Sequence, residues 1–228
     1  MTTIEIIDEL KLLSTPEHFQ KLSHFGIKDT KALGVKIPDI RNFAKTLGKN
    51  HELALELWDT EIHEARLLAT MVESVSSISE NQFDNWVQNF DSWDICDQTC
   101  NLFVNTPFIY KKIDAYFGRN EEFVKRAAFV LMCQLALHDK KATNELFLHY
   151  LSLVELEAWD NRNFVRKAVN WALRQIGKRN EVLRLEAIKT AENLLKQGSR
   201  SARWIATDAL RELKNEKVIE RVRAKRKK

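Results

Sequence analysis

An internal repeat in the second half of the chain is the feature that most restricts its fold. The segment 123–128, Phe-Val-Lys-Arg-Ala-Ala, returns 41 residues later as 164–169, Phe-Val-Arg-Lys-Ala-Val. A weaker third copy, Ala-Arg-Trp-Ile-Ala at 202–206, follows 37 residues beyond the second. A period near 40 with helical patterning is typical of HEAT-like helical pairs, which bury their apolar faces only by stacking on one another. Short turn signals precede the three copies at residues 116–118, 159–161 and 197–199.

The remaining sequence also has helical rather than strand patterning. Ile4, Ile7 and Leu10 lie at the three-residue spacing of an amphipathic helix. Pro is tolerated in the first turn of a helix, and three segments that contain it predict helix starts: 15–17, 37–39 and 106–108. With only 6 Gly and 3 Pro, the chain lacks the turns that a sandwich or barrel needs. We therefore expect an all-α protein, a curved α-solenoid of HEAT-like helical repeats that forms a right-handed superhelix with a basic concave face.

The charge distribution is uneven along the chain, although no linker rich in Pro, Gly or Ser divides it. Residues 1–110 carry 9 basic and 17 acidic residues, a net charge of −8, whereas residues 111–228 carry 27 and 15, a net charge of +12. This asymmetry favours a polyanion-binding face on the second half, and solvated charges on exposed helix faces are the alternative. We expect a single domain over residues 1–220 and a basic tail at 221–228, which either attracts phosphates or only solubilises the protein.

The cysteines and the N-terminus bear on the cellular environment. Cys96, Cys100 and Cys133 are too few for a disulfide framework and fit a reducing cytosol. Cys96 and Cys100 share a helical face, but no CxxC motif or histidine cluster accompanies them, so we expect core packing rather than metal binding. The chain shows neither a signal peptide nor a run of 18 apolar residues. A cytoplasmic monomer without metal, cofactor or membrane partner is therefore expected.

The segment 92–97, Ser-Trp-Asp-Ile-Cys-Asp, is the strongest candidate for chemistry. Ser92 can cap a helix, which puts Trp93 and Asp97 four residues apart on one face. Asp94 then lies in the first turn, where the helix dipole favours negative charge. An aromatic face beside a carboxylate can receive a cationic or developing positive group. The structural alternative is that Trp93 anchors the core and Asp97 pairs with an arginine.

Trp171 and Arg174 form a second pair on one helical face. In the preceding copy of the 41-residue repeat, the equivalent positions are Val130 and Cys133. A Trp and an Arg at positions where the other copy has small apolar residues indicate a function besides stacking. Packing between repeats is the alternative. We expect Arg174 to contact substrate. Equivalent positions of the copies also present basic side chains to a common surface, where they are candidates for substrate or phosphate contact: Arg126 with Lys167, and Lys125 with Arg166 and Arg203.

Together these segments resemble the AlkD-type DNA alkylation-repair glycosylases, which are built from HEAT-like repeats. The resemblance rests on residues 92–97, on Lys-Arg-Ala-Ala at 125–128, and on Arg-Lys-Ala-Val-Asn-Trp-Ala-Leu-Arg at 166–174. It implies excision of positively charged N3- or N7-alkylated purines from double-stranded DNA, without a metal or a cofactor. It also implies that the lesion is processed without flipping into a deep pocket.

The resemblance assigns roles to individual residues. Asp97 is the catalytic carboxylate, Trp93 and Trp171 flank the deoxyribose of the lesion, and Arg126 holds the nearby backbone. An alkylated purine already carries positive charge, so the protein must mainly stabilise an oxocarbenium-like sugar and position water, which suits an ionised carboxylate. One departure is clear: the best-known members carry two consecutive tryptophans where this chain has Ser92 and Trp93.

Three functions remain open from the sequence. The first is an alkylpurine DNA glycosylase, and the second is a non-catalytic HEAT-repeat protein that binds damaged, bent or branched DNA. The third is a helical-repeat protein scaffold without affinity for DNA. The charge asymmetry and the aromatic–carboxylate pair favour the first two over the scaffold.

Overall fold

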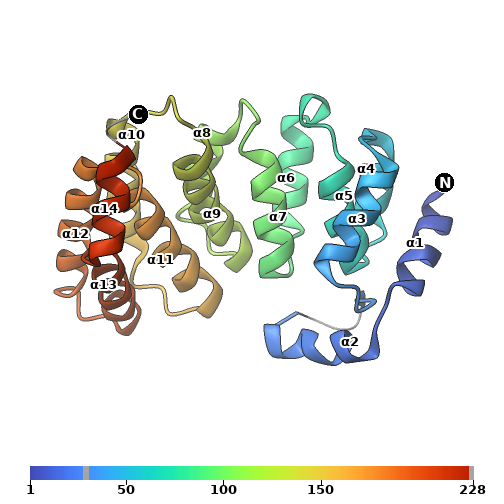
Figure 1. Ribbon diagram of the computed structural model, residues 1–228, viewed down its shortest axis with the longest axis horizontal. Coiled ribbons are helices and arrows are strands. Elements are labelled where there is room, and N and C mark those ends of the chain that lie inside the picture. Colours follow the sequence, from blue (N-terminus) through green and yellow to red (C-terminus); the bar gives the residue numbers. More distant parts are fainter. Residues whose placement is uncertain (28–30, 226–228) are drawn as a thin grey trace. The chain divides into compact units, whose positions relative to one another are not determined.

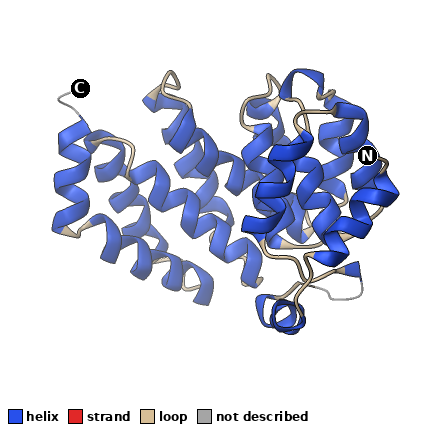
Figure 2. Ribbon diagram, turned by 45° about the vertical axis from the view of Figure 1, so that its right-hand side comes forward, coloured by secondary structure: helices blue, strands red, loops and turns tan. Residues whose placement is uncertain are grey.

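The computed structural model describes residues 1–27 and 31–225, and in this part of the chain it contains fourteen α-helices and no strand (Figure 1, Figure 2). The prediction of an all-α protein is therefore confirmed. The helices form two compact units, unit 1 (Met1–Pro107) and unit 2 (Phe108–Lys228). The single domain over residues 1–220 and the right-handed superhelix with a basic concave face stay predictions.

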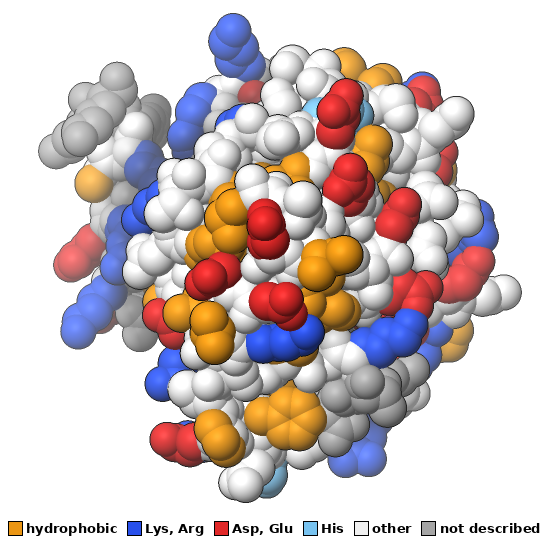
Figure 3. Space-filling view, turned by 90° about the vertical axis from the view of Figure 1, so that its right-hand side faces the viewer, with side chains coloured by type: hydrophobic (Ala, Val, Ile, Leu, Met, Phe, Trp, Pro, Cys, Tyr) orange, Lys and Arg blue, Asp and Glu red, His pale blue; other side chains and the backbone are white. Residues whose placement is uncertain are grey.

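The boundary between the units coincides with the change of charge along the chain. Residues 101–110 contain no charged side chain, so unit 1 carries the net charge of −8 and unit 2 the net charge of +12. The end of unit 1 that carries α1 (Thr3–Leu12) shows acidic side chains spread between hydrophobic ones (Figure 3). The change in net charge therefore coincides with the division between the units, although no linker rich in Pro, Gly or Ser separates them.

Unit 1 is organised around α5 (His63–Val72), which packs against α3, α4 and α7. Every side chain from His63 to Thr70 is buried. Glu64, which is fully buried, accepts hydrogen bonds from three successive backbone N–H groups, those of residues 33–35, at 2.7, 2.7 and 3.2 Å. These bonds compensate the loss of hydration of the carboxylate and hold the loop before α3 against α5. The other helices of unit 1 are α2 (Pro16–Leu22), α3 (Ile37–Leu47), α4 (His51–Asp59), α6 (Glu80–Gln88) and α7 (Trp93–Phe103).

Two of the three helix starts predicted from proline are confirmed, and the third, at residues 106–108, lies just before the helix and not in its first turn. The helix α2 begins at Pro16, α3 has Pro38 in its first turn, and α8 (Ile109–Tyr116) begins two residues after Pro107. The fixed φ of proline and its missing N–H suit the first turn, where that N–H would have no helical partner.

The apolar face predicted for the first helix is partly wrong. Ile4 is 73% exposed, and the buried side chains of α1 are Ile6 and Leu10, which lie four residues apart. Isoleucines at positions 4, 6 and 7 give α1 more than one apolar face, and its contacts with α4 and α5 select the face that is buried. Periodicity alone does not distinguish these faces.

Unit 2 is a stack of helical pairs with the predicted period. The helices α9, α11 and α13 begin at residues 122, 163 and 200, so their spacings are the 41 and 37 residues of the repeat. Within the stack, α11 packs against α9 and α13, and α10 packs against α12. The repeat prediction is therefore confirmed. The elements that follow α8 are α9 (Glu122–His138), α10 (Asn144–Glu157), α11 (Asn163–Gly177), α12 (Glu181–Leu194), α13 (Arg200–Leu213) and α14 (Glu216–Ala224).

The predicted basic tail differs from the structure in its first residues. Residues 221–224 continue α14, which packs against α12 and α13, and Val222 is only 2% exposed. The burial of Val222 therefore anchors α14, and with it the first residues of the predicted tail, to the helical stack. Residues 226–228 of the tail lie outside the described residues.

The three cysteines, Cys96, Cys100 and Cys133, are fully buried, so the expectation of core packing is confirmed. Among residues 1–27 and 31–225, no group of His, Cys, Asp and Glu side chains is arranged to hold a metal ion. No helix in this same part of the chain combines the length and the apolar character needed to cross a membrane.

Gly177 lies where the end of α11 approaches α12 and α13 closely. A Cβ atom on Gly177 would lie 2.8 Å from Cδ2 of Leu213 and 2.9 Å from Cβ of Ala187. Both distances are well below the optimal separation of two carbon atoms, about 3.5–4.0 Å. The absence of a side chain at Gly177 therefore permits this helix crossing.

We expect Gly177→Ala to lower the free energy of unfolding by about 1–3 kcal/mol, because overpacking outweighs the better helix propensity of alanine. Urea denaturation measures this change. Gly118→Ala is the matched control, since a Cβ atom there would meet no heavy atom within 4 Å. An equal loss of stability in both variants would contradict the packing argument.

Candidate functional site

The candidate catalytic segment lies at the start of α7 in unit 1. Ser92 occupies the N-cap position, as predicted, but its side chain makes no capping hydrogen bond. Trp93 and Asp97 are one helical turn apart and both are half-buried. The face beside them is fully buried and packs into the unit through Ile95, Cys96, Thr99 and Cys100. Asp97 therefore belongs to the partly exposed face of α7 and not to its core face.

Trp93 closes one side of a pocket in unit 1. Its indole Nε1 donates a hydrogen bond to the backbone carbonyl oxygen of Phe25 at 2.9 Å, which fixes the position of the ring. The pocket has a volume of about 200 Å³. His63 and Asp94 supply polar groups to its lining, and the apolar lining residues are Leu22, Phe25, Ile27, Val35, Ile37 and Leu67.

His63 and Asp94 form a buried ion pair beside Trp93. His63 Nε2 lies 2.9 Å from Asp94 Oδ2, and the two side chains are 8% and 13% exposed. Burial lowers the pKa of His63, but the hydrogen bond and the charge of Asp94 outweigh it, so the pKa is raised. Burial likewise raises the pKa of Asp94, but His63 outweighs this effect and the pKa is lowered. Both shifts favour the charged pair, which joins α5 to the first turn of α7.

Trp171 and Arg174 lie together on α11 of unit 2. Both are half-buried, whereas their repeat equivalents Val130 and Cys133 are fully buried in α9. Arg174 forms an ion pair with Glu212 of α13, and its Nε lies 3.6 Å from a second α13 carboxylate. A substrate group would have to compete with these carboxylates for the Arg174 guanidinium.

Lys125 is buried in α9, with 3% of its surface exposed. Its Nζ lies 2.6 Å from Glu157 Oε2, 3.4 Å from Asp160 Oδ2 and 5.3 Å from the centre of the Trp159 ring. Two carboxylates thus neutralise the ammonium group, as a buried charge requires. Lys125 is therefore poorly placed for the phosphate contact predicted for it.

Arg126 is also buried, with 5% of its surface exposed. Its Nη1 donates a hydrogen bond to the backbone carbonyl oxygen of Phe164 at 2.7 Å, which ties α9 to the first turn of α11. The repeat equivalent of Arg126 is Lys167, which is exposed. The two equivalent positions thus differ in their access to solvent, although the sequence predicts a common surface for them.

The remaining basic candidates also differ in accessibility. The Arg166 guanidinium carbon lies 4.7 Å from the centre of the Trp204 ring, a cation–π contact between α11 and α13. Lys167 and Arg203 are exposed, and within the described residues their side chains have no hydrogen-bond or ion-pair partner. Lys167 and Arg203 are therefore the predicted phosphate contacts that are most accessible.

The predicted site residues thus form two sets, each within one unit. Trp93 and Asp97 lie together on α7, and Trp171 lies with Arg174 on α11. His63 was not predicted, because its contact with Asp94 joins residues 31 positions apart and leaves no periodic signal. The only signal in the sequence is a histidine at the start of a predicted helix.

A family model described as "DNA alkylation repair enzyme" matches residues 6–213, and none of the curated proteins matches the chain. Among solved structures, the chain is similar to a protein described under "A new family of proteins related to the HEAT-like repeat DNA glycosylases with affinity for branched DNA structures". The two share 18% identity and a TM-score of 0.80, over 93% of this chain and 96% of that one. The HEAT-like repeat fold is therefore confirmed.

The ion pair of His63 and Asp94 predicts a pH-dependent stability. Since the pKa of His63 is raised, its contribution is complete below the ordinary value of 6.5 and is lost as the pH rises through the raised value. Since the pKa of Asp94 is lowered, its contribution is present above 3.8 and is lost as the pH falls through the lowered value. The stabilising window therefore includes mildly acidic pH.

We expect His63→Gln to destabilise unit 1 by about 1–2 kcal/mol more at about pH 5.5 than at about pH 9. Urea denaturation at the two pH values measures the difference. His149→Gln is the control, because His149 lies 3.0 Å from Asp114 in an exposed pair that contributes little. A pH-independent loss in His63→Gln would show that the pair acts only through packing.

Proposed function

Because the chain belongs to the DNA alkylation repair enzyme family, we propose that it is a DNA glycosylase for cationic N3- or N7-alkylated purines in duplex DNA. The family model spans residues 6–213, and the family resemblance predicted from the motifs is confirmed. One observation carries the finer proposal: Trp93 and Asp97 lie one turn apart on the partly exposed face of α7. This pair combines the aromatic ring and the carboxylate that the reaction needs.

The proposed reaction follows from the charge of the lesion. When the N-glycosidic bond breaks, its electron pair stays with the alkylated purine, which leaves as a neutral base. The positive charge then develops on the deoxyribose in an oxocarbenium-like transition state. The Asp97 carboxylate stabilises this charge, and it positions the water that attacks C1′ and accepts its proton. The face of Trp93 adds a cation–π attraction to the sugar.

Unit 2 contributes contacts to the DNA in this proposal. Trp171 is the second aromatic contact to the sugar, and its partial exposure supports this role. Lys167 and Arg203 bind backbone phosphates, which their exposure and the net charge of +12 over residues 111–228 support. Such contacts fix the position of a protein on DNA without reading its sequence.

Arg126 and Arg174 act differently in this proposal from the direct substrate contacts predicted for them. Arg126 binds the backbone of Phe164, and Arg174 pairs with Glu212. Both bonds join α11 to a neighbouring helix. The two arginines therefore hold Trp171 in place by fixing the helix that carries it.

A second candidate function is the binding of branched or bent DNA without base excision. The specific observation in its favour is the fold similarity, at a TM-score of 0.80, to a protein described as having affinity for branched DNA structures. Ser92 also favours it, because the best-known glycosylases of this type carry a tryptophan at that position. Ser92 is 1% exposed at the N-cap of α7 and offers no aromatic surface.

We expect Asp97→Asn to lower the rate of base excision by about 10²–10³-fold, because the neutral amide cannot stabilise the cationic sugar. Its affinity for undamaged duplex DNA should be unchanged. Incubation with methylated duplex DNA, followed by identification of released 7-methylguanine and 3-methyladenine, measures the rate. Asp91→Asn is the control, since Asp91 lies just before α7, is 49% exposed and is 3.7 Å from Arg66.

The outcomes of this experiment separate the two functions. Excision by the natural chain that is unchanged in Asp97→Asn would remove Asp97 from the mechanism. Tight binding of a four-way junction without release of any alkylated base would favour the non-catalytic function. Absence of DNA binding at low salt would reject both.

We expect Trp171→Ala to lower the excision rate without a comparable loss of affinity for undamaged duplex, because the ring acts on the charged transition state. Single-turnover excision and fluorescence anisotropy measure the two quantities. Trp204→Ala, which removes an exposed ring from α13, is the control. Parallel losses of rate and affinity would instead indicate that Trp171 only binds DNA.

A further inference from the structure

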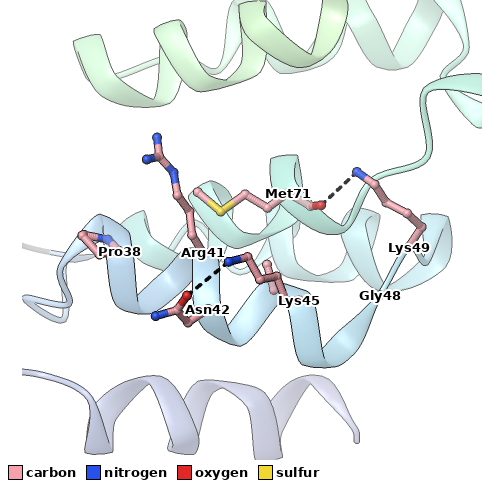
Figure 4. A pocket seen from close by; sticks show the side chains of 8 residues that line it. Pro38, Arg41, Asn42, Lys45, Gly48, Lys49 and Met71 are labelled. Carbon is pink, nitrogen blue, oxygen red and sulfur yellow. Dashed lines mark hydrogen bonds between the residues drawn. The ribbon is translucent and has the colours of Figure 1, made fainter.

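Unit 1 carries a row of cationic side chains on one side of α3, although its net charge is −8. Arg41 and Lys45 lie one turn apart on α3, and Lys49 follows Gly48, the C-cap residue of this helix. They line an open depression of about 480 Å³ (Figure 4). The other lining residues are Pro38, Asn42, Ala44, Gly48 and Met71.

The basic residues of unit 1 fall into two groups, of which only one is neutralised by carboxylates. Eight of its nine basic residues are described, and four of them form ion pairs: Lys11 with Asp8, Lys21 with Glu17, Lys31 with Glu61 and Arg66 with Asp91. The other four described residues are Lys36, Arg41, Lys45 and Lys49, and of these Lys36 interacts electrostatically with the carboxylate of Glu17. Arg41, Lys45 and Lys49 therefore concentrate the unpaired positive charge of an acidic unit in one segment.

The three side chains of the row differ in how firmly they are held. Lys49 Nζ donates hydrogen bonds to the backbone carbonyl oxygens of Met71 at 3.0 Å and Glu73 at 2.9 Å, at the end of α5. These bonds fix the ammonium at one end of the depression and leave its charge uncompensated. Lys45 Nζ makes only a long contact of 3.5 Å with Asn42, and Arg41 extends from α3 without a hydrogen-bond or ion-pair partner among the described residues (Figure 4).

The arrangement selects an extended anion rather than a small one. The three side chains point in different directions and do not converge on one point (Figure 4). Arg41 and Lys45 are about 6 Å apart along the helix axis. One strand of a DNA duplex presents a phosphate about every 3.4 Å of its axis, so these two side chains span about two phosphates. Arginine and lysine without internal partners keep their full charge for such contacts.

We propose that Arg41, Lys45 and Lys49 form a second DNA-backbone contact, on unit 1, besides the phosphate contacts of unit 2. This inference rests on the proposed function, because it requires that the chain binds DNA. The contact increases affinity for any sequence and gives no base specificity. The acidic unit therefore takes part in DNA binding through residues 41–49, which contain no acidic side chain.

The double variant Arg41→Gln, Lys45→Gln tests the proposal, with Lys49 retained because it caps α5. Binding of a labelled undamaged duplex is measured by fluorescence anisotropy at several salt concentrations. We expect the slope of log K against log salt concentration to become less steep by up to about 2, because each lost phosphate contact changes it by about 0.9. At about 0.1 M salt the affinity should fall by roughly ten- to a hundredfold.

The matched control is Lys11→Gln, Lys21→Gln, which removes the same two charges from unit 1 at side chains already paired with carboxylates. Its salt slope should remain that of the natural chain. If the natural chain and both variants have the same salt slope, this inference is overturned and the proposed function is left intact. If both variants lose the same amount of DNA affinity, the inference is also overturned. Failure of the natural chain to bind DNA would overturn both, and thermal melting of each variant excludes loss of fold as the cause.

Discussion

The burial of α11 between α9 and α13 is the contact on which unit 2 depends. A single helical pair cannot cover its own apolar face, so each pair becomes stable only when the next pair packs on it. Small side chains make this possible, since Ala128 of α9, Ala168 of α11 and Ala202 of α13 are fully buried. The same close packing requires a glycine at Gly177. Trp171 therefore projects from a helix that is fixed on both sides.

The features that depend on local sequence could be predicted, and those that depend on distant partners could not. Repeat spacing and proline positions predicted helix starts because a helix is built from contacts three and four residues apart. The burial of Lys125 could not be predicted, because Glu157 and Asp160, which neutralise it, lie in the next helical pair. His63 was missed for the same reason. The shared face of Trp93 and Asp97 could be predicted, because the two residues lie one helical turn apart.

The net charges of the two units do not show which charged side chains are paired and which are available at the surface. Unit 2 is strongly basic, yet Lys125 and Arg174 are engaged by carboxylates inside it. Unit 1 is acidic, yet it holds the cationic row that begins at Arg41. A net charge counts paired and unpaired side chains equally, whereas a polyanion responds to charge that remains uncompensated at the surface.

The cation–π contacts of unit 2 have a spectroscopic consequence. Lys125 of α9 lies over Trp159, which follows α10, and Arg166 of α11 lies over Trp204 of α13. Each contact joins one helical pair to the next, so each indole senses the separation of a different neighbouring pair. Stacked repeats can come apart one after another, because each touches only its neighbours. Trp159 and Trp204, two of the three tryptophans of unit 2, thus stand at successive junctions. Their fluorescence can distinguish fraying from the C-terminal end from a single concerted transition.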